Sequence, residues 1–293
     1  MTRVQFEFPA LFATASGMSA NAQSEYLRLI RLEYLLLIVS SVLALNLAVT
    51  RTYYVAAAVA ILASLSVLIL RNARKPEQSW YRGRALAESI KTSCWKYCMG
   101  AEPFGRNDSP AVTRAEFRNY LTAILEANRF VGYEMPPDAA ADEQITPSME
   151  QIRSSDLGVR KTYYEELRIK NQRVWYAKKA AVNRNASRWW FRAAVGAYGA
   201  AIIMALARIA EPAAVIWPIE PFLVVASSLI GWMQVKKFNE LASSYTLTAH
   251  EIGILQGKIA EVDSEESWSA FVVDAEQAFS REHTQWVARQ QYA

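Results

Sequence analysis

Two stretches of the chain, one in each half, are almost free of charged residues. The first runs from Tyr34 to Leu70 and contains one charged residue, Arg51. The second runs from Ala193 to Val235 and is charged only near its middle. A helix in a soluble core usually keeps a polar face toward water, so such a concentration of apolar residues is unusual there. Two membrane-spanning hairpins are therefore the first hypothesis for the fold.

The lengths of the apolar segments fit four membrane crossings. A hydrocarbon core of ~30 Å needs roughly 17–25 helical residues. Four segments come close to this length: Leu32–Val49, Tyr53–Leu70, Ala193–Ile209 and Pro221–Val235. The fourth is the weakest, since Pro218 and Glu220 interrupt the apolar run before it. The alternative is a soluble helical protein in which the four segments are buried core helices.

Basic residues predict how the two hairpins are oriented. They flank both stretches: Arg28, Arg31, Arg71, Arg74 and Lys75 around the first, and Lys178, Lys179, Arg184, Arg188, Arg192, Lys236 and Lys237 around the second. Each hairpin turn carries one basic residue, Arg51 in a turn expected at Thr50–Thr52 and Arg208 in the other. Since flanking Lys and Arg are retained in the cytoplasm, both hairpins should enter the membrane from that side. We expect both termini and residues 72–190 to be cytoplasmic.

The rest of the chain is helical in pattern. Apolar residues recur at three- and four-residue steps over Trp80–Tyr97, and a capping-box spacing at Thr113–Glu116 predicts a helix start. A long helix is expected from Val159 into the third span, and a last helix from about Ser267. No strand-like alternation of useful length occurs. The predicted fold class is all-α, an integral membrane protein with four spans and long cytoplasmic helices.

The expected domain order follows these segments. Residues 1–24 form an N-terminal cytoplasmic tail, and 25–130 form a first two-span unit with cytoplasmic helices. Residues 131–158 are a linker, since Pro136, Pro137 and a run of Ala and Asp residues interrupt the helical pattern. Residues 159–293 form a second two-span unit that ends in cytoplasmic helices.

Residues suited to catalysis are few. The two histidines, His250 and His283, have no cysteine or carboxylate at metal-ligand spacing, and no Gly-rich phosphate loop is present. Ser280 and His283 are close together but lack an orienting acid, so a helix cap and an interfacial histidine are the favoured interpretation. Cys94 and Cys98 share a helix face and are expected to be buried thiols. We expect no enzymatic activity, no metal and no cofactor.

Small residues recur at four-residue steps along the third span, at Ala193, Ala197, Ala201 and Ala205. Such a stripe lets helices approach closely in lipid, either within a hairpin or between protomers of a homo-oligomer. Apart from Glu220, no ionisable residue lies at the centre of a span, whereas an ion-coupled transporter would be expected to keep one. The spans thus indicate a passive conduit or a scaffold.

Basic and aromatic residues alternate after the first hairpin: Arg82, Arg84, Lys91 and Lys96 among Trp80, Tyr81, Trp95 and Tyr97. This combination suits nucleotide or nucleic-acid binding. It equally suits a helix lying against anionic headgroups, which is the favoured interpretation beside a membrane span. The lipid bilayer is therefore the expected partner, and no direct nucleic-acid binding is expected.

Two motifs resemble a known family. The first is Trp80-Tyr81-x-x-Arg84-Ala85-x-Ala87-Glu88-Ser89-x-Lys91-Thr92-x-x-Trp95, placed just after a two-span hairpin and followed by Pro103-Phe104. It resembles the SLATT domain, the two-transmembrane effector domain associated with SMODS nucleotidyltransferases and SLOG sensors in bacteria. The second half is similar, with Gln172-x-x-Trp175-Tyr176-x-x-Lys179 before its hairpin and Ser280-Arg281-Glu282-His283-x-x-Trp286 after it. The resemblance covers nearly the whole chain as two tandem units.

The resemblance implies a multi-pass effector of a conflict or antiphage system in the bacterial inner membrane. Such a protein would assemble and open a pore, or breach the bilayer, on a signal such as a nucleotide sensed by a partner protein or by residues 72–190. The motif matches imply a set of residues that couple the cytoplasmic helices to the hairpins: Trp80, Arg84, Glu88, Ser89, Lys91, Trp95, His283 and Trp286. Plain helix packing is their alternative role. The alternative function is a membrane-anchored helical scaffold that recruits a cytoplasmic partner.

Overall fold

The chain is built from helices. The computed structural model describes residues 6–106, 109–129, 132 and 143–291, and the side chains of residues 281–291 lie outside that description. Within these ranges there is no strand, so the all-α prediction is confirmed. The elements are α1 (Ala10–Leu43), α2 (Arg51–Arg74), α3 (Pro76–Met99), α4 (Pro110–Ala127), α5 (Pro147–Ser154), α6 (Leu157–Tyr164), the π-helical segment η3 (Glu165–Lys170), α7 (Asn171–Ala210), α8 (Ile219–Lys236), α9 (Phe238–Lys258), the 3₁₀ turn η4 (Ile259–Glu261) and α10 (Glu265–Gln291).

These helices form two compact units, each assembled from separate parts of the chain. The hairpin unit consists of Ser24–Pro76 and Lys179–Ser243. The bundle unit consists of Met1–Gln23, Glu77–Lys178 and Ser244–Ala293. The predicted tail 1–24 contains the first turns of α1. Of the predicted linker 131–158, residues 131 and 133–142 lie outside the described residues, and the part from 147 onward forms α5 and the first residues of α6.

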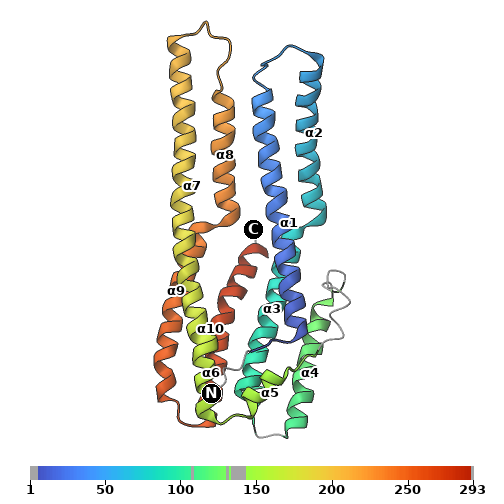
Figure 1. Ribbon diagram of the computed structural model, residues 1–293, viewed down its shortest axis with the longest axis vertical. Coiled ribbons are helices and arrows are strands. Elements are labelled where there is room, and N and C mark those ends of the chain that lie inside the picture. The colour runs from blue at the N-terminus through green and yellow to red at the C-terminus, as the bar shows by residue number, and fades with distance from the viewer. Residues whose placement is uncertain (1–5, 107–108, 130–131, 133–142, 292–293) are drawn as a thin grey trace. The chain divides into compact units, whose positions relative to one another are not determined.

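The hairpin unit contains two antiparallel helix pairs. Residues 44–50 join α1 to α2, and residues 211–218 join α7 to α8. Figure 1 shows the two pairs side by side, with both joining loops at the same end of the unit. The pairs touch where α8 meets α1: a Cβ atom added at Gly231 would lie 2.4 Å from the Tyr34 hydroxyl oxygen. Any larger residue at position 231 would therefore force the Tyr34 side chain to move.

The first hairpin turns earlier than its sequence predicts. A span reaching Val49, with a turn at Thr50–Thr52, is wrong because α1 already ends at Leu43. Thr50 is the N-cap of α2, and its hydroxyl oxygen accepts a hydrogen bond from the Tyr53 N–H (3.3 Å). A threonine in this position satisfies a free amide at the helix start, so Arg51 becomes the first helical residue rather than the centre of the turn.

The second helices of both hairpins end in the same way. Lys75 after α2 and Lys237 after α8 have left-handed backbones, with φ of 47° and 48°. The Lys75 N–H donates to the Arg71 carbonyl (3.0 Å), and the Lys237 N–H donates to the Met233 carbonyl (2.9 Å). A new helix then starts at once, α3 after the first break and α9 after the second. The two hairpins therefore end in the same local backbone geometry.

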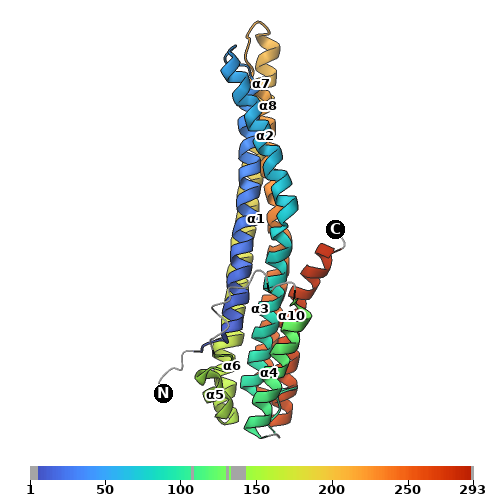
Figure 2. The same ribbon diagram turned by 90° about the vertical axis from the view of Figure 1, so that its right-hand side faces the viewer.

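The bundle unit is centred on α3. This helix includes residues Trp80–Tyr97, so the helix predicted there is confirmed. Figures 1 and 2 show α3, α4 and α10 running alongside one another. Tyr97 and Phe117 form the contact between α3 and α4, with ring centres 4.7 Å apart. Cys94 and Cys98 are free and fully buried in α3, as predicted, and burial raises the pKa of both thiols.

The predicted start of α4 is wrong. The helix begins at Pro110, and Ser109 is its N-cap: the Ser109 hydroxyl accepts a hydrogen bond from the Val112 N–H (3.4 Å). Thr113 lies one turn inside the helix, and its hydroxyl donates to the Ser109 carbonyl (3.4 Å). A Ser followed by Pro at the first helical position is the stronger start signal, because proline has no N–H to leave unsatisfied.

Candidate functional site

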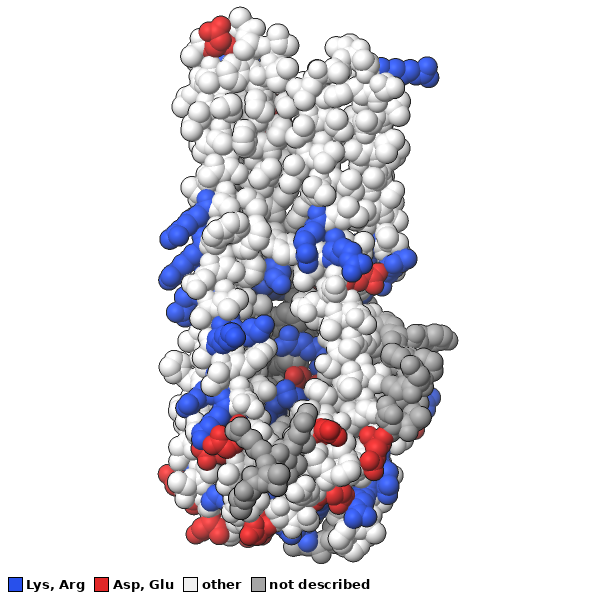
Figure 3. All heavy atoms as spheres, viewed as in Figure 1, with Lys and Arg blue, Asp and Glu red and all other residues white. Residues whose placement is uncertain are grey.

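The outer surface of the hairpin unit is apolar. Leu62 of α2 and Ile203 of α7 are each 61% exposed. Many more large apolar side chains are exposed around them: Leu35, Leu37, Val39, Val55, Val59, Ile61, Leu65, Ile69, Val195, Ile202, Leu206, Leu223 and Ile230. Figure 3 shows this surface almost without charge and bounded at one end by a band of Lys and Arg. A soluble protein rarely exposes a contiguous apolar patch of more than a few hundred Å², so this surface fits lipid.

Two helical runs are long and apolar enough to cross a membrane, judged by length and composition. They are Arg51–Met99, which contains α2, and Leu157–Ala210, which contains α7. In each, 17% of the most apolar window is buried, so these are not the enclosed helices of a soluble core. Their partners α1 and α8 do not meet the same criterion. In α1 the early end at Leu43 shortens the apolar run, and in α8 Glu220 and Gln234 interrupt it.

The alanine stripe of α7 faces partly into the hairpin unit. Ala201 is buried, and Ala193, Ala197 and Ala205 are half-buried. This placement accounts for part of the stripe by packing within the unit, the first of the two roles that the spacing predicts.

A fully buried ion pair lies at the centre of the bundle unit. Arg168 of η3 donates from Nε to Glu276 Oε1 (2.8 Å) and from Nη2 to Glu276 Oε2 (2.6 Å). The Tyr164 hydroxyl also donates to Oε1 (2.9 Å), and the Thr92 hydroxyl donates to Oε2 (3.1 Å). One carboxylate thus receives four hydrogen bonds from α3, α6 and η3. Burial alone would lower the pKa of Arg168, but Glu276 raises it overall, so the guanidinium stays charged.

Two motif residues stand next to this pair. The Lys91 ammonium lies 3.5 Å from the Glu88 carboxylate, at the i,i+3 spacing that the sequence shows. Burial and the Arg168 guanidinium lower the pKa of Lys91, while Glu88 and Glu276 act in the opposite direction. Arg168 itself sits in a π-helical turn, a distortion that is frequent at functional sites. Charged residues of the first motif therefore connect electrostatically to the second half of the chain.

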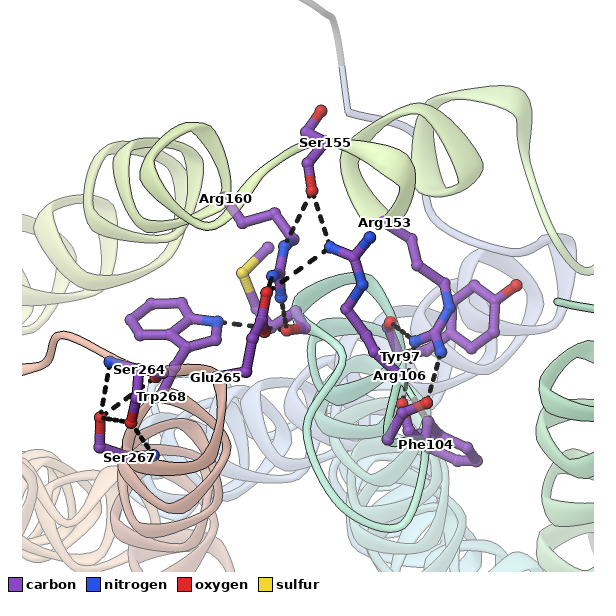
Figure 4. Close-up of polar contacts among 12 residues, drawn as sticks. Tyr97, Phe104, Arg106, Arg153, Ser155, Arg160, Ser264, Glu265, Ser267 and Trp268 are labelled. Atoms are coloured by element: carbon purple, nitrogen blue, oxygen red, sulfur yellow. Dashed lines mark hydrogen bonds and ion pairs between the residues drawn. The ribbon is translucent and has the colours of Figure 1, made fainter. Parts of the chain in front are cut away.

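Arginines surround the carboxyl end of α3 (Figure 4). Arg153 of α5 donates to the carbonyls of Tyr97 (2.6 Å), Phe104 (3.0 Å) and Gly105 (2.8 Å). Arg160 of α6 donates to the Met99 carbonyl and, from Nε, to the Ser155 carbonyl (3.1 Å). Carbonyls at the end of a helix carry partial negative charge and have no partner within the helix, so cations stabilise them.

The same cluster reaches the start of α10. Arg160 pairs with Glu265, and the Trp268 indole N–H donates to the Met99 carbonyl (3.1 Å) (Figure 4). Arg106 donates to the Ser155 carbonyl (2.9 Å) and lies 3.8 Å from Glu265. These guanidinium groups form hydrogen bonds with carbonyls and pair with one carboxylate. The cluster therefore holds α3, α5, α6 and α10 together.

The predicted coupling residues do not form one surface. Trp80 and Trp95 are buried, Arg84, Glu88 and Lys91 are half-buried, and Ser89 is exposed. Trp95 stacks on Phe6, with ring centres 4.6 Å apart, so it is a core residue rather than an exposed platform for a base. His283 and Trp286 lie in α10, and their side chains are outside the described part of the chain. The coupling role of these residues stays a prediction.

Sequence reasoning missed Arg153, Arg160, Arg168 and Glu276. One local signal existed for Glu276, since it stands on the apolar face of α10 among Phe271, Val272, Ala275 and Phe279. A lone carboxylate on such a face requires a buried partner. The sequence does not show which cation is this partner, because the contact joins segments that are far apart in the chain.

Comparison with protein families gave two matches that together cover most of the chain. The chain matches the family SLATT_3, described as "SMODS and SLOG-associating 2TM effector domain 3", over residues 9–161. It matches SLATT_1, "SMODS and SLOG-associating 2TM effector domain 1", over residues 164–286. The protein belongs to the SLATT family and carries two such domains in tandem, as the motifs predicted. SLATT domains are associated with conflict and antiphage systems.

Comparison with curated proteins and with solved structures gave no match. The family and the two candidate membrane helices together indicate a membrane protein. Both matched domains contribute to both compact units, because each unit contains residues from 9–161 and from 164–286.

Proposed function

We propose that this protein is a non-enzymatic effector of a bacterial conflict system. In the proposal it spans the inner membrane four times, assembles into a homo-oligomer and breaches the bilayer when triggered. The observation that supports this proposal is the exposed apolar surface of the hairpin unit. Both helices of each hairpin contribute apolar side chains to that surface. In this arrangement α1 and α8 cross the membrane together with α2 and α7. Glu33 of α1 flanks its span near the membrane interface, where its charge is paired with Arg71 (3.1 Å).

The trigger in this proposal reaches the bundle unit, through a partner that makes or senses a nucleotide signal. Contacts between the two SLATT domains support a concerted response. Thr92 of the first domain bonds to Glu276 of the second, and Arg160 of the first pairs with Glu265 of the second. A change in one cytoplasmic half would therefore strain contacts made by the other.

Induced expression in bacterial cells is expected to collapse the membrane potential and stop growth, on induction alone or on phage challenge. A potential-sensitive dye and viable counts provide the readout. Gly231→Leu is a matched variant of unchanged charge. It places a side chain where the Tyr34 hydroxyl lies, so it should separate the hairpins and suppress the depolarisation. Unchanged potential and growth at equal membrane abundance, under both conditions, would favour a membrane-anchored scaffold instead.

The proposed topology can be tested by cysteine labelling on the native background. Cys94 and Cys98 are buried with raised pKa values, so they should react slowly with a maleimide. Val49→Cys and Val215→Cys, in the two hairpin loops, should label in intact spheroplasts with a membrane-impermeant maleimide. Glu116→Cys, on exposed α4, should label only after permeabilisation. Labelling of Val215→Cys only after permeabilisation would show that the second hairpin does not cross.

A further inference from the structure

Two cationic side chains lie close to one aromatic ring between the two hairpins. The ring is that of Trp232, near the end of α8. The Arg31 guanidinium carbon of α1 lies 5.6 Å from the ring centre, and the Lys236 ammonium nitrogen lies 5.9 Å from it. Trp190 of α7 packs edge-on against the same ring at 6.3 Å. Three helices of the hairpin unit therefore meet at Trp232, at the end of the unit that carries the basic band.

The charges at this point are of one sign. Burial, then Arg31 and Lys179, lower the pKa of Lys236. In the described part of the chain, the two charged groups that shift Lys236 are thus both cations. The nearby carboxylates of α1 are engaged elsewhere: Glu33 and Glu25 pair with Arg71 and Arg74 of α2, each at 3.1 Å. Like charges held together in a partly buried place repel one another, and a bound anion would relieve that repulsion.

A hydrogen-bond donor at the same place lacks an acceptor. The Trp232 indole N–H is buried and has no hydrogen-bond partner among the described residues. A buried donor without an acceptor costs ~1–3 kcal/mol. Tryptophans at membrane interfaces normally direct this N–H toward headgroups. One kind of ligand would satisfy both the Trp232 indole N–H and the surrounding cations, namely an anion with several acceptor oxygens.

We infer that Arg31, Trp232 and Lys236, with Lys179 beside them, bind the phosphate of an anionic phospholipid between the two hairpins. A phosphate accepts charge-assisted hydrogen bonds from guanidinium and ammonium groups and a neutral one from the indole. The basic flanks place this end of the unit toward the cytoplasmic leaflet, which is rich in anionic lipid. The lipid source rests on the membrane placement proposed above. The anion site itself rests on the local geometry.

The test measures thermal unfolding of the purified full-length protein in neutral-detergent micelles. Rising mole fractions of phosphatidylglycerol should raise the unfolding midpoint, and equal amounts of zwitterionic phosphatidylcholine should not. Lys236→Gln and Arg31→Gln should each raise the half-saturating mole fraction about tenfold, the loss of one charge-assisted bond. Trp232→Phe keeps the ring and the fold and should raise it about threefold. Arg192→Gln, at an exposed arginine of α7 that is not part of the proposed site, should leave it within about twofold.

A separate arm with inorganic phosphate distinguishes the two sources of the anion. A shift with phosphatidylglycerol alone supports a lipid site, and an equal shift with inorganic phosphate, lost in the same variants, supports an anion site open to free phosphates. Equal responses of the wild type, Lys236→Gln and Trp232→Phe would overturn the inference. So would an equal loss in Arg192→Gln, since diffuse surface charge would then explain the binding. The micelle assay requires no depolarising activity, so its failure is distinguishable from that of the proposed function.

Discussion

Replacing Glu276 with glutamine is expected to destabilise the bundle unit by about 3–5 kcal/mol, because Arg168 would keep its charge in a buried position without a carboxylate partner. Arg168 and Glu276 are 1% and 0% exposed, so water cannot replace the lost partner. Tyr164 and Thr92 would also lose the charged acceptor of their hydrogen bonds. Differential scanning calorimetry of the detergent-solubilised full chain would record the lowered transition of this unit.

Two further variants separate the ion pair from a general effect of charge. The double variant Arg168→Met/Glu276→Leu removes both charges and should recover most of the lost stability, since buried ion pairs are often replaceable by apolar residues. Glu266→Gln, an exposed carboxylate on the same helix, should change stability by no more than about 0.5 kcal/mol. If Glu276→Gln unfolded at the wild-type temperature, the ion pair would not be holding the bundle together.

Periodic patterns were sufficient to predict the long helices but not α5, which lies within the predicted linker. The apolar steps over Trp80–Tyr97 predict α3, and the pattern from Val159 predicts the run through α6, η3 and α7. Such patterns are local consequences of helix geometry, in which residues three and four apart share a face. The helix ends were less predictable, as Leu43 and Ser109 show, because caps depend on single residues rather than on a repeated pattern.

The ion pairs of the bundle unit join residues that are far apart in the sequence, so no local pattern predicts them. Arg168 and Glu276 are 108 residues apart in sequence, and Arg160 and Glu265 are 105 apart. Lys and Arg are present on each of α3, α4, α5, α6 and α7, so the sequence alone does not indicate which of them are buried. The π-helical turn that carries Arg168 adds to the difficulty, because it shifts the helix face that an ideal period would assign.

The tandem organisation also has a different meaning in the structure than in the sequence. The family matches follow one another along the chain, over 9–161 and 164–286, but each compact unit is assembled from both. Helices α3 and α10, from different SLATT domains, share the Glu276 network and the Met99 carbonyl. The parts of the two domains that form the bundle unit should therefore unfold together rather than as two independent modules.

Introducing an arginine into the exposed faces of both α2 and α7 should abolish membrane integration. Leu62 and Ile203 are each 61% exposed, so the double variant Leu62→Arg/Ile203→Arg adds one charge to each hairpin without displacing a neighbour. Both positions are changed because a single arginine would leave the other hairpin as an anchor. At an exposed position in water such a change costs no more than about 0.5 kcal/mol. At the centre of a span, arginine in place of leucine costs about 3–4 kcal/mol on insertion scales. Carbonate extraction should thus release the variant, or the cell should degrade it, whereas the wild type should stay in the membrane pellet.

Val174→Arg supplies the matched control. Val174 is 62% exposed and lies on α7 within the bundle unit, so the same charge enters an equally exposed site that is proposed to face water. This variant should remain in the membrane pellet at the wild-type level. Equal retention of both variants would show that the exposed faces of α2 and α7 are not in contact with lipid. The four crossings would then be wrong, because α2 is one of the two helices that meet the membrane criterion without help from a partner.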